Sequence, residues 1–223
     1  MRVLVTGGAG YVGATAVRSL RAEGHEVVVY DNLSKGHREA VPSDVVLLTG
    51  DIAERSKLDA ALREHRPEAV LHFAASIEAG ESMRTPEKYF RNNSAWTLTL
   101  LEAMMANGVG KLIFSSTAAL YGEPRHIPIV ETDPLEPTNA YGESKLVGNG
   151  CCYGLGVYTA SGMRVCGTSM PQDQTATRES AINRSLTWFR LYCKQQSENA
   201  SPSPSMALTI PRPTAPASGT IST

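Results

Sequence analysis

Residues 3–13 read VLVTGGAGYVG, a short apolar run that passes into closely spaced glycines. The run predicts a buried strand, and Gly7, Gly10 and Gly13 form a GxxGxxG pattern before a helical stretch. Glycines there permit the turn, let the main chain approach a pyrophosphate, and let the helix pack close to the strand. The N-terminus of that helix faces the anion. The stretch therefore predicts a dinucleotide-binding strand, turn and helix.

Asp31 follows Gly13 by 18 residues, at the end of a second predicted strand. A carboxylate at this place hydrogen-bonds both ribose hydroxyls and repels a 2′-phosphate. The sequence therefore favours NAD over NADP as the cofactor. The alternative is that Asp31 is a turn or capping residue of the pair Asp31-Asn32.

The alternation of strands and helices continues to residue 146. The predicted strands are 3–6, 26–30, 45–49, 69–73 and 111–115, and the predicted helices are 11–23, 53–65 and 85–107. Five βα units with right-handed crossovers predict an α/β fold, a Rossmann-like doubly wound parallel sheet with helices on both faces.

Composition narrows the class of protein. The 223 residues, 42% of them hydrophobic, support one core and are too few for two large domains. A net charge of -1 offers no basic face for nucleic acid or anionic lipid, so a small-molecule partner is favoured. We expect a cytoplasmic protein, since neither a leader-like start nor an apolar stretch of about 18 residues occurs. The cysteine spacing matches neither a zinc site nor a disulfide framework, and no metal is expected; the cysteines are Cys151, Cys152, Cys166 and Cys193.

A catalytic group is predicted around residues 141–145, which read YGESK. Tyr141 and Lys145 share one face of a helix, and hydroxyl residues 115–117 lie about 25 residues earlier. An ammonium near a phenol stabilises the phenolate, and a positive nicotinamide ring adds to that effect. The pair therefore predicts a general base for a sugar hydroxyl.

Over residues 1–146 the chain resembles the extended short-chain dehydrogenase/reductase family, and within it the UDP-glucose 4-epimerases. The stretches that carry the resemblance are TGGAGYVG, Tyr30-Asp31-Asn32, Gly50-Asp51-Ile52, His72–Ala75 (HFAA), Gly80-Glu81-Ser82, Asn92-Asn93, FSSTAALYG and YGESK. The resemblance implies that Tyr141 is the base, that Lys145 is its electrostatic and ribose-binding partner, and that Thr117 holds the sugar oxygen. His72 is better interpreted as a structural residue at a strand end.

The resemblance also implies a cofactor site, a substrate and an assembly. The cofactor-binding positions are Gly7, Gly10, Tyr11, Val12, Gly13, Asp31, Asn32, Ser34, Asp51, Ile52, Phe73, Ala74, Ala75, Asn93, Ser115, Tyr141 and Lys145. Thr117 and Tyr141 contact a UDP-sugar, UDP-glucose or UDP-galactose, whose C4 hydrogen leaves as hydride to NAD and returns to the other face of a 4-keto intermediate. A homodimer is expected through helix 85–107 and the helix of Tyr141, the second of which we expect to be cut short.

Three other functions stay open. Related nucleotide-sugar dehydratases carry an Asp-Glu pair after the Thr, where this chain has Ala118-Ala119, so the dehydratase class is disfavoured. Another epimerase or reductase of the family, a non-catalytic NAD-binding protein and a non-functional translation product remain, although the retained Tyr141, Lys145 and Thr117 argue against the second. Trp96 stands where the family has a small or amide residue.

The sequence changes character after Leu146, and we expect neither a continuing helix nor a sixth strand. Read one base earlier, residues 163–175 (MRVCGTSMPQDQT) admit YASLRYFNAAGSD, and residues 207–223 admit GTDYPTPDGTCIRDYIH, which both resemble the family. We infer that the reading frame is lost near residues 147–149 and that 147–223 is an out-of-frame, poorly ordered tail. The edge of strand 111–115 is then uncovered, and epimerase activity is expected to be weak or absent.

Overall fold

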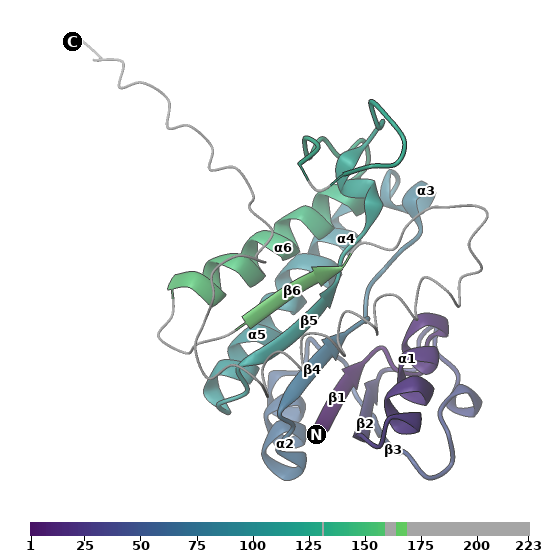
Figure 1. Ribbon diagram of the computed structural model, residues 1–223, viewed down its shortest axis with the longest axis vertical. Coiled ribbons are helices and arrows are strands. Elements are labelled where there is room, and N and C mark those ends of the chain that lie inside the picture. Colours follow the sequence, from purple (N-terminus) through teal and green to yellow (C-terminus); the bar gives the residue numbers. More distant parts are fainter. Residues whose placement is uncertain (131, 159–163, 169–223) are drawn as a thin grey trace.

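Parallel pairing joins every strand of the sheet (Figure 1). A computed structural model describes residues 1–130, 132–158 and 164–168, and the predictions made for 159–163 and 169–223 lie outside the described residues. The strands are β1 (Arg2–Thr6), β2 (Glu26–Asp31), β3 (Val46–Thr49), β4 (Ala69–His72), β5 (Lys111–Ser115) and β6 (Arg164–Thr168). Their order is β3-β2-β1-β4-β5-β6, which confirms the Rossmann-like sheet.

Each of the first five strands ends within one residue of its predicted bounds. Alternation along β1 explains why the sheet is buried on both faces. Leu4 belongs to a core cluster with residues of α2 (Arg55–His65), whereas Val3 and Val5 pack with residues of α1 (Tyr11–Ala22). Both faces of the strand are therefore apolar, as is typical of parallel sheets.

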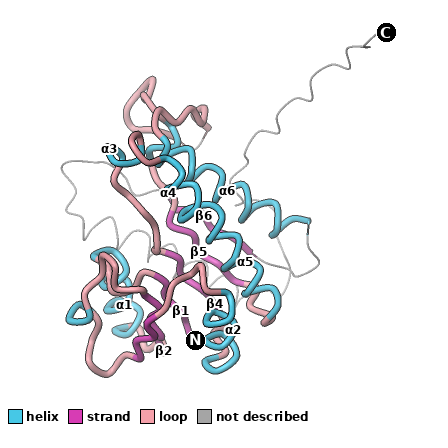
Figure 2. Tube along the Cα trace, turned by 180° about the vertical axis from the view of Figure 1, so that it is seen from behind, coloured by secondary structure: helices cyan, strands magenta, loops and turns pink. Residues whose placement is uncertain are grey.

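Among the described residues, helices cover the two faces of the sheet unequally. On the face seen in Figure 2 lie α2, α4 (Pro86–Phe90), α5 (Trp96–Ala106) and α6 (Ala140–Tyr158), and α1 packs on the other face. The larger cluster includes Leu100 and Met104 of α5 and Cys152 of α6. Helix α6 therefore belongs to the layer that closes the core behind β4 and β5.

Two predictions about the region after Leu146 are wrong. Helix α6 continues to Tyr158, and β6 pairs along the whole of β5, with Phe114 opposite Gly167. The run RVCGT is short and contains β-formers, and the backbone groups at the edge of β5 offer it hydrogen-bond partners. The edge of β5 is thus covered, and the helix of Tyr141 is not cut short.

The predicted helix 85–107 is not continuous. Pro86 begins α4, a π-helical turn η2 (Arg91–Ala95) follows, and α5 starts at Trp96. The π turn shifts the register, and Asn93 and Ser94 become buried. Trp96 is accommodated, because its half-buried ring packs against the larger core cluster.

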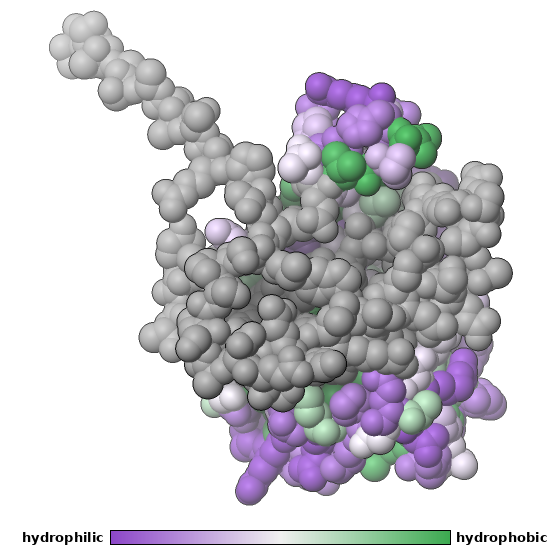
Figure 3. Space-filling model, viewed as in Figure 1, coloured by the Kyte–Doolittle hydropathy of each residue, from purple (hydrophilic) through white to green (hydrophobic). Residues whose placement is uncertain are grey.

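The described surface is mixed in polarity. Figure 3 shows mostly hydrophilic residues at the lower end of one face, with isolated apolar groups between them. Within the described ranges, no helix has the length and apolarity needed to cross a membrane.

Candidate active site

The predicted site residues meet at one edge of the sheet. Gly7 follows β1, Asp31 ends β2, Phe73 follows β4, and Thr117 follows β5. Because all the strands are parallel, these ends share an edge, and the strand order reverses between β1 and β4. Ligands of open α/β sheets bind in the crevice at such a switch point.

The glycine turn has the geometry of an anion site. Gly7 has a φ of 72°, and a Cβ there would lie 2.5 Å from the Ala74 amide nitrogen. A Cβ on Gly13 would collide with the Gly7 carbonyl oxygen, so α1 needs glycine to pack this close. Gly10 caps α1 with no side-chain hydrogen bond, and the first turn carries no acidic residue. The positive end of the helix is therefore suited to a pyrophosphate.

Two further predicted positions lie on the first turn of α1. Tyr11 is the first helical residue, and its side chain is 64% exposed beside the glycine turn. Val12 instead packs against the smaller core cluster. Through its side chain, Val12 supports the turn rather than facing a ligand.

The carboxylate of Asp31 is buried and already bonded. Its Oδ2 accepts the Ala9 amide at 2.9 Å, and its Oδ1 accepts the Leu33 amide at 2.8 Å. Leu33 has a φ of 58°, so the carboxylate stabilises a left-handed turn residue. The structure therefore shows Asp31 in the role of a turn-stabilising residue, the alternative given for it above.

Residues beyond β3 lie beside the Asp31 loop. Asn32 donates to Asp51 Oδ2 at 2.7 Å, and the Tyr30 hydroxyl donates to the Asp51 carbonyl at 3.0 Å. Burial first, and then the Glu54 charge, raises the pKa of Tyr30 to about 12, which keeps it a donor. The other two predicted positions nearby are Ile52, which is buried, and Ser34, which is exposed.

Phe73, Ala74 and Ala75 form the wall opposite the glycine turn. The Phe73 amide donates to the Thr6 carbonyl at 2.9 Å, which extends the β1–β4 pairing by one residue. A side chain on Gly7 would collide with the backbone of Ala74. The crevice is therefore narrow at the switch point.

Tyr141, Thr117 and Lys145 come together at the end of β5. The Thr117 side chain lies near enough to the Tyr141 phenol to lower its pKa, and Lys145 Nζ donates to the Ser115 carbonyl at 2.9 Å. Lys145 is 2% exposed, and its Nζ lies 4.7 Å from the centroid of the Phe114 ring. Desolvation lowers the pKa of Lys145 to about 8.

The phenol of Tyr141 does not have the lowered pKa predicted for a ready base. Desolvation raises its pKa above 10, and the Thr117 side chain acts in the opposite direction. The physical reason is that burial penalises the phenolate. A positive charge next to the ring would offset that penalty, and a nicotinamide ring is such a group.

Both polar atoms of the Asn93 side chain form hydrogen bonds with other residues of the chain. Its Oδ1 accepts the Ser76 amide at 2.9 Å, and its Nδ2 donates to the Ser76 carbonyl at 2.9 Å and to Ser144 Oγ at 3.0 Å. Ser94 Oγ donates to the Ser144 carbonyl at 2.8 Å. The π turn is thereby bonded to α6 one residue before Lys145. Sequence reasoning missed Ser144 and Ser94, although Ser144 lies within YGESK.

His72 is a structural residue in this geometry. The fully buried ring lies between Thr6 Oγ1 at 2.6 Å and Thr97 Oγ1 at 3.2 Å. Thr97 donates its own proton to the Asn93 carbonyl at 2.8 Å, so it accepts from His72 Nε2, and Thr6 donates to Nδ1. Desolvation, with the Lys145 charge, lowers the pKa of His72 to about 3. The neutral ring links β1, β4 and α5.

One contact from the second half of α6 also reaches the site. Asn149 Nδ2 donates to Ser116 Oγ at 2.9 Å, next to Thr117. Asn149 lies one helical turn beyond Lys145, on the same face. No local sequence pattern indicates this contact, because its partner lies 33 residues earlier.

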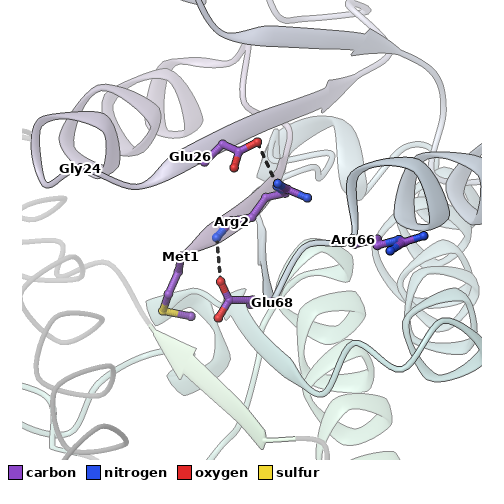
Figure 4. Close-up of a pocket in the computed structure, with 6 residues that line it drawn as sticks. All are labelled: Met1, Arg2, Gly24, Glu26, Arg66 and Glu68. Atoms are coloured by element: carbon purple, nitrogen blue, oxygen red, sulfur yellow. Dashed lines mark hydrogen bonds and ion pairs between the residues drawn. The ribbon is translucent and has the colours of Figure 1, made fainter.

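A separate hollow opens at the opposite edge of the sheet, at the amino ends of β1 and β2 (Figure 4). Arg2 there pairs with Glu26 at 2.9 Å, and its amide donates to Glu68 at 3.0 Å. The remaining lining residues are Met1, Gly24 and Arg66. The hollow lies at the amino ends of the strands, whereas the glycine turn follows the carboxyl end of β1, so the hollow is not part of the site.

Comparison with known proteins gives one consistent result. Residues 3–171 match the NAD dependent epimerase/dehydratase family. A UDP-glucose 4-epimerase of Corynebacterium glutamicum is 51% identical over 146 residues, which cover 66% of this chain and 44% of that protein. The chain thus spans less than half of that relative.

Solved structures agree with this match. A UDP-glucose 4-epimerase from Brucella ovis in complex with NAD superposes with a TM-score of 0.71 at 40% identity, over 74% of this chain and 50% of that one. The Thermotoga maritima UDP-glucose 4-epimerase with UDP-glucose gives a TM-score of 0.71 at 33% identity, over 76% and 55% of the two chains. The similarity therefore covers the sheet described above and about half of each neighbour.

Proposed function

Because the chain belongs to the NAD dependent epimerase/dehydratase family, we propose that residues 1–146 form the NAD-binding and catalytic part of a UDP-glucose 4-epimerase. The observation that carries the proposal is the meeting of Tyr141, Thr117 and Lys145 at the edge that also holds the glycine turn. A general base, a hydroxyl and a cation beside a dinucleotide crevice are suited to oxidising and re-reducing a sugar alcohol.

The residues of the crevice fit NAD. The side-chain-free turn at Gly7 and Gly10 leaves the first amides of α1 for the pyrophosphate, and Asp31 stands where it can bind ribose hydroxyls. Bound at these residues, NAD would supply the acceptor and donor of the hydride at C4 of the sugar. Asp51, Ile52, Phe73 to Ala75 and Asn93 frame the rest of the proposed cofactor site.

In the proposed reaction, residues of this chain bind the sugar 4-hydroxyl and accept its proton. Tyr141 takes the proton of the sugar 4-hydroxyl, and Thr117 holds the same oxygen. Lys145, whose buried ammonium donates to the Ser115 carbonyl, would bind the cofactor ribose, and the positive nicotinamide ring would offset the desolvation of the phenolate. Ala118 and Ala119 follow Thr117, so no carboxylic acid there is available to expel a hydroxyl.

We propose that the chain as given binds NAD and turns over UDP-sugars weakly or not at all. Its support is the proposed loss of frame near 147–149, after which residues for the sugar nucleotide are no longer encoded. We infer a pairing surface on α5 and α6 of this chain, where Leu98, Val147 and Tyr153 are exposed apolar side chains. Light scattering of the purified chain tests that pairing.

Calorimetric titration with NAD and NADP tests the cofactor assignment. We expect one NAD per chain and at least about tenfold weaker binding of NADP, because the Asp31 carboxylate repels a 2′-phosphate. Asp31→Asn keeps the side-chain shape and removes the charge, and it should narrow the gap between the two nucleotides. Equal affinities in the parent chain, or no binding of NAD, would contradict the proposal.

A further inference from the structure

Tyr141 is held by a residue from a distant element. Helix α6 begins at Ala140, so the Tyr141 amide is one of the N-terminal amides that lack a partner within the helix. Ser82 Oγ accepts this amide at 3.0 Å and donates its own proton to the Ala79 carbonyl at 2.7 Å. Ser82 is fully buried, and both hydrogen-bonding roles of its hydroxyl are used.

The same short helix, α3 (Ala79–Ser82), also fixes the surroundings of the Tyr141 ring. The buried Tyr89 ring meets Tyr141 edge to face, with centroids 6.4 Å apart and planes at 76°. The Tyr89 hydroxyl lies 2.7 Å from the Glu78 carbonyl and 2.8 Å from Glu81 Oε2. Burial, followed by the hydrogen bond to Glu81, raises the pKa of Tyr89 to about 12, so this phenol stays a neutral donor.

We propose that Ser82 is a positioning residue that sets the Tyr141 phenol against Thr117 and Lys145. The proposal rests on the proposed function of Tyr141 as the base. Ser82 acts on the backbone of the base itself, and Tyr89 limits rotation of its ring. A shift at the Tyr141 backbone would be carried to the phenol oxygen at the far end of the side chain.

Asn139 provides a matched comparison for Ser82. Its Oδ1 accepts the Gly142 amide at 2.9 Å, so it caps the same helix end from within the chain segment. Loss of either cap should lower the unfolding temperature by a similar amount, since each leaves one helix amide without its acceptor. Only the loss of Ser82 releases the amide of Tyr141, which separates positioning from simple helix capping.

The experiment measures how NAD changes the pKa of Tyr141 in the full 223-residue chain. Tyrosinate absorbance is followed against pH with and without NAD, and the titration of Tyr141→Phe is subtracted to isolate this phenol. In the parent chain we expect NAD to lower the pKa of Tyr141, because a positive nicotinamide ring lies close to it. In Ser82→Ala we expect roughly half of that lowering or less, and in Asn139→Ala the full lowering.

Three outcomes decide the proposal. Full lowering in Ser82→Ala, or equal loss in Ser82→Ala and Asn139→Ala, overturns the positioning role alone. No lowering by NAD in the parent chain overturns Tyr141 as the base and, with it, the positioning role. Should Ser82→Ala fail to fold, Ser82→Cys replaces the hydroxyl with a weaker acceptor: a smaller lowering of the Tyr141 pKa by NAD than in the parent supports the proposal, and the full lowering overturns it.

Discussion

Helix α6 divides near Leu146 into two halves that are built differently. In the first half, Ser144 and Lys145 are almost fully buried polar residues, and each is bonded to another element. The second half, 147–158, contains four glycines among its 12 residues, Gly148, Gly150, Gly154 and Gly156. It is anchored by the buried Cys152 and by Leu155, which packs against the larger core cluster.

The comparison indicates that a segment shaped by selection and a segment that was not can form one continuous helix. Burying Lys145 costs stability, and a chemical role explains why the cation is nevertheless there. Glycines at helical positions also cost stability, about 1 kcal/mol each relative to alanine, and nothing near Gly150 or Gly154 requires them. The proposed loss of frame near 147–149 accounts for these glycines, because packing of the second half then owes little to selection.

Restoring the frame is the strongest way to test this difference. One base added near codons 147–149 should raise UDP-galactose epimerisation by at least about a thousandfold, because the restored half would orient the sugar nucleotide. A coupled assay for UDP-glucose measures the change. Turnover by the chain as given at the rate of the restored protein would show that the second half of α6 is native, and the comparison would fail.

Tyr141→Phe in the restored protein tests the first half directly. We expect kcat to fall by about 10² to 10⁴, because the phenol that moves the proton is lost. NAD affinity should change little, since the glycine turn and Asp31 are untouched. Lys57→Met, a change at a 56% exposed surface side chain in α2 that the restored frame leaves unaltered, is the control and should retain full kcat. Equal losses of kcat in the two variants would contradict the assignment of Tyr141 as the general base.

The first five strands and the glycine turn could be predicted because their signals are local. Apolar runs mark the strands, and Gly7 and Gly13 occupy positions that no side chain tolerates. The continuation of α6 and the strand β6 could not be predicted, since glycines disturb the 3.6-residue period and β6 depends on the edge that β5 offers. In such segments tertiary context outweighs local propensity.

The reacting side chains of the site could be predicted from the sequence, but the residues that hold them in place could not. Tyr141, Lys145 and Thr117 follow from a motif, and the structure brings them together. Ser82 and Ser144 act through hydrogen bonds to residues 59 and 51 positions away, so no local pattern reveals them. The raised pKa of Tyr141 was missed for the same reason, because desolvation depends on the packed fold.

Lys145→Met tests the stability cost in the first half. The pKa of Lys145 is about 8 in the folded chain against an ordinary 10.5, so between these values the unfolded chain binds more protons. The cost is therefore complete below about pH 8 and disappears as the pH rises toward 10.5. We expect Lys145→Met to raise the free energy of unfolding at pH 7 by about 2 kcal/mol, with the gain shrinking at higher pH.

Urea denaturation at several pH values measures this difference. Lys57→Met is the matched control, because the Lys57 side chain is 56% exposed and binds Glu54 at the surface. That variant should stay within about 0.5 kcal/mol of the parent at every pH. A pH-independent difference between Lys145→Met and the parent would mean that the ammonium is not the costly group.

Alanine substitutions of glycine give the smallest and most local test of the two halves. A Cβ on Gly142 would lie 2.6 Å from the Ala119 carbonyl oxygen and 3.0 Å from Pro137 Cβ, so Gly142→Ala should destabilise the chain by about 1 to 3 kcal/mol. At Gly150 and Gly154 a Cβ meets nothing within 4 Å, and alanine should stabilise each position by about 0.5 to 1 kcal/mol. Thermal unfolding separates these opposite signs. Destabilisation at Gly150 or Gly154 would mean that these glycines serve a contact, and the second half of α6 would then resemble the first.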